Sequence, residues 1–172
     1  MNTVTSKVCV VGDFAVGKTS TVERFVNNHF SEKYLTTVGV KIDTKEVALP
    51  EHGVTQKMVL WDVAGKEIFG DIEMAYLRGA SGYIFVADGT RSATIYVAKN
   101  LRKEIEARYG PRPFVLLLNK SDLKSAWEIS DALLEELRSE NDHVFVTSAK
   151  TGDDVEEALT TLATLITDID TA

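Results

Sequence analysis

Short runs of apolar and β-branched residues alternate along this chain with longer segments whose apolar residues recur every three or four positions. This alternation is typical of strands separated by helices in an α/β fold with a mostly parallel sheet. The pattern predicts six strands, at about 7–11, 41–49, 56–62, 82–88, 114–119 and 144–147. It also predicts five helices, which follow Gly17, Ile68, Arg91, Ala126 and Gly152.

The second and third predicted strands are joined by a short turn at residues 50–53. We therefore expect them to pair as a hairpin and to give the sheet its one antiparallel edge strand. The last helix shows its buried face most clearly, because apolar residues recur at helical spacing at Val155, Leu159, Leu162, Ala163 and Ile166. That stripe should pack on the sheet, with helices on both faces. No repeat or linker interrupts the pattern, so residues 1–172 are expected to form a single domain.

Composition narrows the classes of function that need to be considered. The 172 residues are 44% hydrophobic, which suits one core, and the formal charge of −7 argues against a nucleic-acid binder. The single cysteine, Cys9, lies in an apolar run, so it is predicted to be a core residue without a disulfide partner. No run is long enough to insert into a bilayer, and no C-terminal cysteine is present for lipidation. We expect a cytoplasmic monomer.

Residues 12–19 read Gly-Asp-Phe-Ala-Val-Gly-Lys-Thr and fit the phosphate-loop pattern G-x-x-x-x-G-K-[ST], between a predicted strand and a predicted helix. Its glycines permit a tight bend in which N–H groups converge on phosphate oxygens, and the helix start adds partial positive charge. The side chain of Lys18 supplies a full charge near the β- and γ-phosphates, and the Thr19 hydroxyl can bind Mg²⁺. The predicted phosphate-binding residues are Asp13, Phe14, Ala15, Val16, Gly17, Lys18, Thr19 and Ser20.

This loop predicts a P-loop NTPase fold, but it selects neither the base nor the reaction, since ATPases, nucleotide kinases and GTPases all use it. Base selection is indicated by Asn119 and Asp122, which follow a buried strand where open α/β sheets bind ligands. Guanine offers two donors, N1–H and the amino group, which the Asp122 carboxylate can accept together. Adenine N1 is an acceptor and would leave that carboxylate unsatisfied.

A second segment, residues 147–150, follows the sixth predicted strand and can place backbone N–H groups against the guanine carbonyl oxygen. Taken singly, the polar residues of both segments could be ordinary turn or cap residues. Taken together they favour guanine. The predicted guanine-binding residues are Asn119, Asp122, Ser148, Ala149 and Lys150.

The order and spacing of these motifs closely resemble those of the Ras superfamily of small GTPases, over essentially the whole chain. The matching segments are residues 12–19, 34–39, 61–65, 119–122 and 148–150. The neighbourhoods of Thr37 and Trp61, together with residues 76–80, are most similar to the Rab branch. A Roc-type GTPase domain of a larger protein is the alternative resemblance.

The resemblance implies a small GTPase domain that binds GTP or GDP with Mg²⁺ and hydrolyses GTP. In such a protein Thr37 would ligate Mg²⁺ and touch the γ-phosphate, Asp62 would hold the metal through water, and the Gly65 N–H would bond the γ-phosphate. Phe30 would lie against the guanine ring, and Lys120 would flank its other side.

Loss of the γ-phosphate would then release the segments around Thr37 and Gly65. Effector proteins, an exchange factor and an activating protein would bind through residues 34–42 and 62–78. The catalytic residues that the resemblance implies are Lys18, Thr37, Gly65 and the residue that follows Gly65.

Two positions depart from the family pattern. Lys66 replaces the usual glutamine, and an ammonium group cannot accept a hydrogen bond from the attacking water as a glutamine can. Phe14 stands where a small residue is usual, and its ring would crowd an activator's arginine finger unless it turns outward. Hydrolysis is therefore expected to be slow.

Three alternatives remain open. Lys66 is a tolerated surface lysine, or the chain is a nearly non-hydrolysing GTP-binding module, or it is a nucleotide kinase. A kinase would leave Asp122 unexplained.

Overall fold

The computed structural model describes residues 1–28, 39–64 and 70–170, and within them the chain forms a six-stranded sheet of order β2-β3-β1-β4-β5-β6. The strands are β1 (Asn2–Gly12), β2 (Val40–Leu49), β3 (Val54–Val63), β4 (Gly82–Asp88), β5 (Phe114–Asn119) and β6 (Val144–Val146). The helices are α1 (Lys18–Asn27), α2 (Asp71–Ala75), α3 (Ala93–Tyr109), α4 (Asp131–Glu140) and α5 (Val155–Asp170), with short 3₁₀ helices η1 (Pro50–His52) and η2 (Lys124–Ala126). All neighbouring strands are parallel except β2 and β3, which confirms the predicted antiparallel edge.

Two element boundaries differ most from the sequence prediction. Strand β1 begins at Asn2, because β3 is long enough to pair with its polar first residues, from Asn2 opposite Val54 onward. Helix α4 begins at Asp131 and not directly after Ala126, because Ser130 caps it by accepting a hydrogen bond from the Leu133 N–H. The segment before that cap is occupied by η2.

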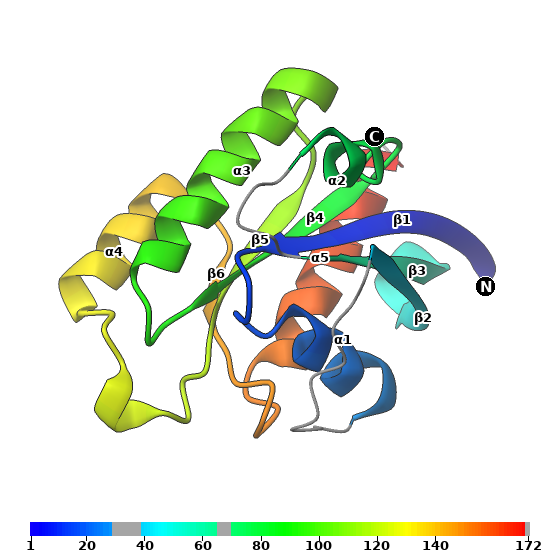
Figure 1. The fold of residues 1–172 in the computed structure, drawn as a ribbon. Helices are drawn as coiled ribbons and strands as arrows, with labels where there is room; N and C mark the ends of the chain where they lie inside the picture. The colour runs from blue at the N-terminus through cyan, green and yellow to red at the C-terminus, as the bar shows by residue number, and fades with distance from the viewer. Residues whose placement is uncertain (29–38, 65–69, 171–172) are drawn as a thin grey trace.

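Helices cover both faces of the sheet, so the core has two parts (Figure 1). On one face Val8 and Val10 of β1 pack with α1 and α5, and on the other Cys9 and Val11 pack with α2, α3 and α4. The predicted stripe of α5 is confirmed, since each of its five residues is at most 1% exposed. Cys9 is fully buried, as predicted, and this burial raises the pKa of its thiol to about 12.

The register of the parallel strands brings four loops to one edge of the sheet. Gly12 at the end of β1 pairs with Val86 of β4, and Asp88 at the end of β4 pairs with Asn119 at the end of β5. The loops that follow β1, β4, β5 and β6 therefore start side by side at the carboxyl edge, where open α/β sheets bind ligands. In the described ranges, no helix has the length and apolar character that a membrane span requires.

Candidate nucleotide-binding site

The phosphate loop depends on glycine at two points of close approach. A Cβ atom on Gly12 would lie 2.3 Å from the carbonyl oxygen of Val86, and one on Gly17 would lie 2.2 Å from the side-chain nitrogen of Asn119. Gly17 also has a left-handed backbone, with a φ of 102°. Both glycines of the motif are thus required by the elements packed behind the loop as well as by its tight bend.

Five consecutive carbonyl groups of this loop, those of residues 12–16, each accept a hydrogen bond from a side chain. The donors are Lys18 Nζ to Gly12 and Asp13 (3.2 and 2.8 Å), Arg91 Nη2 to Phe14 (2.8 Å), Lys120 Nζ to Ala15 (2.9 Å) and Asn119 Nδ2 to Val16 (3.0 Å). In a trans peptide the N–H points opposite to the C=O, so the next N–H groups point away from these donors. Among described residues, nothing accepts a hydrogen bond from the N–H of Ala15, Val16 or Gly17.

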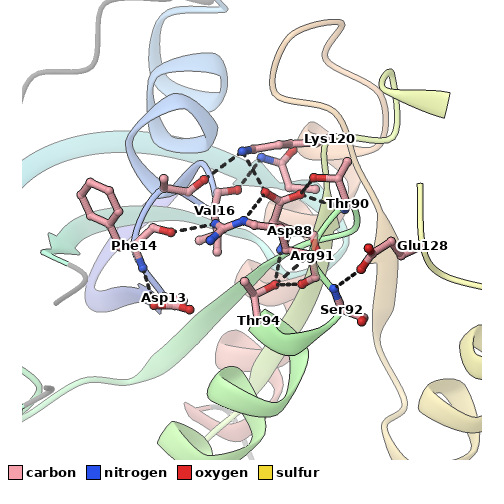
Figure 2. A network of polar contacts seen from close by, with 12 residues as sticks. Asp13, Phe14, Val16, Asp88, Thr90, Arg91, Ser92, Thr94, Lys120 and Glu128 are labelled. Atoms are coloured by element: carbon pink, nitrogen blue, oxygen red, sulfur yellow. Dashed lines mark hydrogen bonds and ion pairs between the residues drawn. The ribbon is translucent and has the colours of Figure 1, made fainter. Parts of the chain in front are cut away.

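Asp88, at the end of β4, anchors two of these donors (Figure 2). The carboxylate is 1% exposed; one oxygen accepts from Arg91 Nε at 3.0 Å and contacts Lys120 Nζ at 2.9 Å. The other oxygen accepts from the N–H and hydroxyl of Thr90, at 2.9 and 2.6 Å. Burial by itself would raise the pKa of Asp88, but the hydrogen bonds from Thr90, Lys120 and Arg91 outweigh it and lower the pKa below its usual value. An ionised carboxylate therefore holds two cations against successive carbonyls.

Two predicted magnesium-side residues meet on the opposite side of the loop. The Thr19 hydroxyl donates to Asp62 Oδ2 at 2.5 Å, and Asp62 is 1% exposed near the end of β3. Burial raises the pKa of Asp62, while the Thr19 hydrogen bond and the charge of Lys18 act in the lowering direction. A hydroxyl and a carboxylate are the hard oxygen donors that Mg²⁺ prefers, so these two residues fit the metal.

Lys18 is buried beside them, with 6% of its surface exposed. Burial lowers the pKa of its ammonium group, and the negative charges of Asp62 and Asp13 oppose that effect. The Asp13 carboxylate also accepts the Phe14 N–H at 2.7 Å. The loop therefore presents a desolvated cation next to N–H groups, which suits a strongly charged anion such as a polyphosphate.

Of the predicted guanine-binding residues, the structure brings Asp122 and Ser148 together. The Ser148 hydroxyl donates to Asp122 Oδ1 at 2.7 Å and accepts from the Thr151 N–H at 3.1 Å, and Ser148 is fully buried. The hydrogen bond fixes the orientation of the carboxylate. Asn119 accepts from the Ala149 N–H at 3.0 Å, so its amide joins the phosphate loop to the loop that follows β6.

Sequence reasoning missed three residues that hold the site together. Asp88 and Arg91 anchor the phosphate loop, and Arg24 of α1 donates to the carbonyl groups of Ala149 and Lys150, at 2.8 and 2.5 Å. A usable signal existed for Asp88, since it is a carboxylate at the end of a fully apolar strand on the binding edge. The two arginines carry no comparable local signal.

Four of the predicted residues, Phe30, Thr37, Gly65 and Lys66, lie outside the described residues. Phe14 is described, and its side chain is 65% exposed. In Figure 2 its ring points away from Asp88 and Arg91, while its carbonyl oxygen faces Arg91. The network around Asp88 therefore contacts the main chain of Phe14 and leaves the ring outside.

Comparison with known proteins identifies the family of the chain. The model of the Ras family matches residues 7–168. Ras-related protein Rab7 of Drosophila melanogaster is 37% identical over 163 residues, which cover 91% of this chain and 78% of that protein. Ras-related protein Rab-27B of Bos taurus is 34% identical, with coverages of 93% and 78%. Ras-related protein Rab-32B of Dictyostelium discoideum is 33% identical over 89% of this chain, which spans only 61% of that relative.

The fold, with a phosphate-loop motif at the carboxyl edge of a mostly parallel sheet, is that of an α/β P-loop GTPase. The chain belongs to the Ras family and is Rab-like.

Proposed function

We propose that this chain is a guanine-nucleotide switch that binds GTP or GDP with Mg²⁺ and hydrolyses GTP slowly. The observation that carries the proposal is the Asp122 carboxylate, held by the buried Ser148 hydroxyl at the same sheet edge as the phosphate loop. An ionised carboxylate in this position accepts both donors of guanine in a charge-assisted pair. Adenine offers an acceptor at the corresponding ring atom and would be rejected.

The residues of the site have separate roles in this proposal. Lys18 and the N–H groups of residues 15–17 bind the β- and γ-phosphates, and Asn119 keeps the base side and the phosphate side at a fixed separation. Thr19 and Asp62 would hold Mg²⁺, Asp62 through water, and the metal would offset charge on the β- and γ-phosphates. Residues 34–42 and 62–78 would report the nucleotide state to partner proteins.

The test of base recognition is the variant Asp122→Asn. Its amide replaces one acceptor by a donor, which suits xanthine, whose 2-oxo group accepts where guanine donates. We expect the unmodified chain to bind GTP far more tightly than ATP or XTP, and Asp122→Asn to prefer XTP, as measured by calorimetry. The matched control is Asp142→Asn, an exposed carboxylate away from the site. If ATP competes equally with GTP, or if Asp122→Asn retains its preference for GTP over XTP, the proposal fails.

Slow hydrolysis follows from Lys66, because its ammonium group donates hydrogen bonds but cannot accept one from the attacking water. Single-turnover GTP hydrolysis should be faster in Lys66→Gln than in the unmodified chain. Phe14→Gly should increase the response to an activating protein that supplies an arginine. If neither change accelerates the reaction, these side chains are not the cause of slow turnover.

A second candidate function is a GTP-binding module that hardly hydrolyses and acts only through nucleotide-dependent protein contacts. The same departure at Lys66 favours it. Product analysis after a long incubation with GTP distinguishes the two functions, since the module would return GTP intact. Hydrogen exchange in residues 34–42 and 62–78, compared between GDP and a non-hydrolysable GTP analogue, tests whether either acts as a switch: protection only with the analogue is expected.

A further inference from the structure

Arg91 lies against the phosphate loop although it belongs to none of the motifs that predict the nucleotide site. It stands in the short segment between β4 and α3, and its guanidinium makes two contacts at once. Nε donates to the buried Asp88 carboxylate at 3.0 Å, and Nη2 donates to the main-chain carbonyl of Phe14 at 2.8 Å. Figure 2 shows the guanidinium between the two acceptors.

These two contacts fix the guanidinium from opposite directions. Asp88 is itself immobilised by Thr90 and Lys120, so the anchor for Arg91 is a buried, multiply bonded carboxylate and not a surface acid. A planar guanidinium can donate from Nε and Nη2 simultaneously in a fixed geometry, which a single ammonium group cannot reproduce. Because Asp88 is fixed, the guanidinium bonded to it is fixed as well, and it holds the Phe14 carbonyl in place.

The carbonyl of Phe14 and the N–H of Ala15 belong to one rigid trans peptide unit, in which they point in opposite directions. When Arg91 holds that carbonyl, it also sets the direction of the Ala15 N–H. Within the described part of the chain, nothing accepts a hydrogen bond from this N–H. Backbone N–H groups aligned in this way are the usual ligands of phosphate oxygens in such loops.

We propose that Arg91 is a positioning residue for the phosphates: anchored on Asp88, it holds the Phe14 carbonyl and keeps the Ala15 N–H directed at the phosphate oxygens. The proposal rests on the proposed nucleotide binding. It assigns to Arg91 a role in retaining GDP and GTP that acts through the main chain, without contact between Arg91 and the nucleotide. Asn119 and Lys120 act on the next two carbonyls in the same way.

The experiment uses the full chain with a fluorescent N-methylanthraniloyl-GDP and Mg²⁺, chased with excess GDP, together with phosphorus NMR of bound GDP. Losing one charge-assisted hydrogen bond to the loop should make release from Arg91→Ala about tenfold faster. The β-phosphorus resonance should shift, because the N–H groups around it are no longer held. Arg91→Lys should release GDP nearly as fast as Arg91→Ala.

The matched control is Arg108→Ala, near the carboxyl end of α3. This arginine is half exposed, and its one ion pair in the described residues is a long one of 3.9 Å to the exposed Asp71. The variant should leave both the release rate and the phosphorus spectrum unchanged. Retention of fluorescent GDP by the unmodified chain tests the proposed nucleotide binding separately. The positioning role is refuted if the unmodified chain retains GDP and Arg91→Ala releases it at the same rate. It is also refuted if Arg91→Ala releases GDP faster but the β-phosphorus resonance does not change. Full recovery in Arg91→Lys would refute the two-contact geometry.

Discussion

The two halves of the phosphate loop are held in different ways. The carbonyls of Gly12 and Asp13 are bonded by Lys18, which lies six and five residues away. The carbonyls of Phe14, Ala15 and Val16 are bonded by side chains 77, 105 and 103 residues away. The first half can form whenever the motif itself is folded, whereas the second half requires that the ends of β4 and β5 are already in place.

The conformation of the phosphate loop therefore depends on the position of the segments that follow β4 and β5. Asn119 donates to the Val16 carbonyl of the phosphate loop and accepts from the Ala149 N–H, so one side chain joins this loop to the loop that follows β6. The first half of the loop supplies a charge at Lys18, and the second half supplies oriented N–H groups. Substitutions that remove the charge or disturb the orientation separately therefore test whether the two halves of the loop act differently.

The largest expected effect is in the first half. Lys18→Ala removes a buried cation that bonds two carbonyls and would face the β- and γ-phosphates. Hydrogen bonds to charged groups contribute about 1.5–3 kcal/mol, so GDP affinity should fall about 100-fold. Calorimetric titration with GDP measures this loss. Lys103→Ala, an exposed lysine of α3, is the control and should bind like the unmodified chain. Equal affinities in the two variants would contradict a phosphate-binding role for Lys18.

The next largest effect is expected in the second half of the loop, and its cause is steric crowding. A Cβ on Gly17 would lie 2.2 Å from Asn119 Nδ2, at a backbone φ of 102°, so Gly17→Ala must displace the Asn119 amide. We expect a loss of about 1–3 kcal/mol in the free energy of unfolding and about tenfold weaker GDP binding. Urea unfolding and calorimetry measure the two quantities.

Gly53→Ala is the matched control for Gly17→Ala. Gly53 also has a left-handed backbone, with a φ of 67°, but a Cβ there would meet nothing within 4 Å. Its substitution should cost stability through backbone strain alone and leave GDP affinity unchanged. If both variants bind GDP equally well, crowding of Asn119 does not matter for the site.

The same division explains what the sequence could predict. The first half of the loop was predictable because Lys18 and the carbonyls it bonds belong to one motif. The contact of Arg91 was not predictable, because it depends on where the segment before α3 lies relative to β1, and no local pattern encodes that. For the fold, β4 and β5 matched the prediction because they are continuous apolar runs, whereas the first residues of β1 are polar and form a strand only through pairing with β3.

A smaller effect is expected at Ser148, whose side chain orients Asp122, the residue proposed to bind the base. Ser148→Ala removes the hydroxyl that donates to Asp122 at 2.7 Å, but leaves the carboxylate itself in place. One hydrogen bond contributes about 0.5–1.5 kcal/mol, so GTP affinity should fall about three- to tenfold, with GTP still preferred over ATP. Competition binding measures both. Ser139→Ala is the control, because the Ser139 hydroxyl donates to the nearby Glu136 carbonyl of the same helix. Unchanged GTP binding in Ser148→Ala would show that Asp122 is oriented without it.

The smallest effect is expected at Phe14, where side chain and main chain have separate roles. The Phe14 carbonyl is bonded by Arg91, while the ring is 65% exposed and points away from that network. Phe14→Ala keeps the carbonyl and, unlike a glycine, adds no backbone freedom. The rate of GDP release should therefore change less than about twofold, as is usual for surface substitutions. Stopped-flow release of fluorescent GDP, run beside Arg91→Ala, makes the comparison direct. If Phe14→Ala accelerates release as much as Arg91→Ala, the ring itself retains the nucleotide, and the distant contacts are not what holds the second half of the loop.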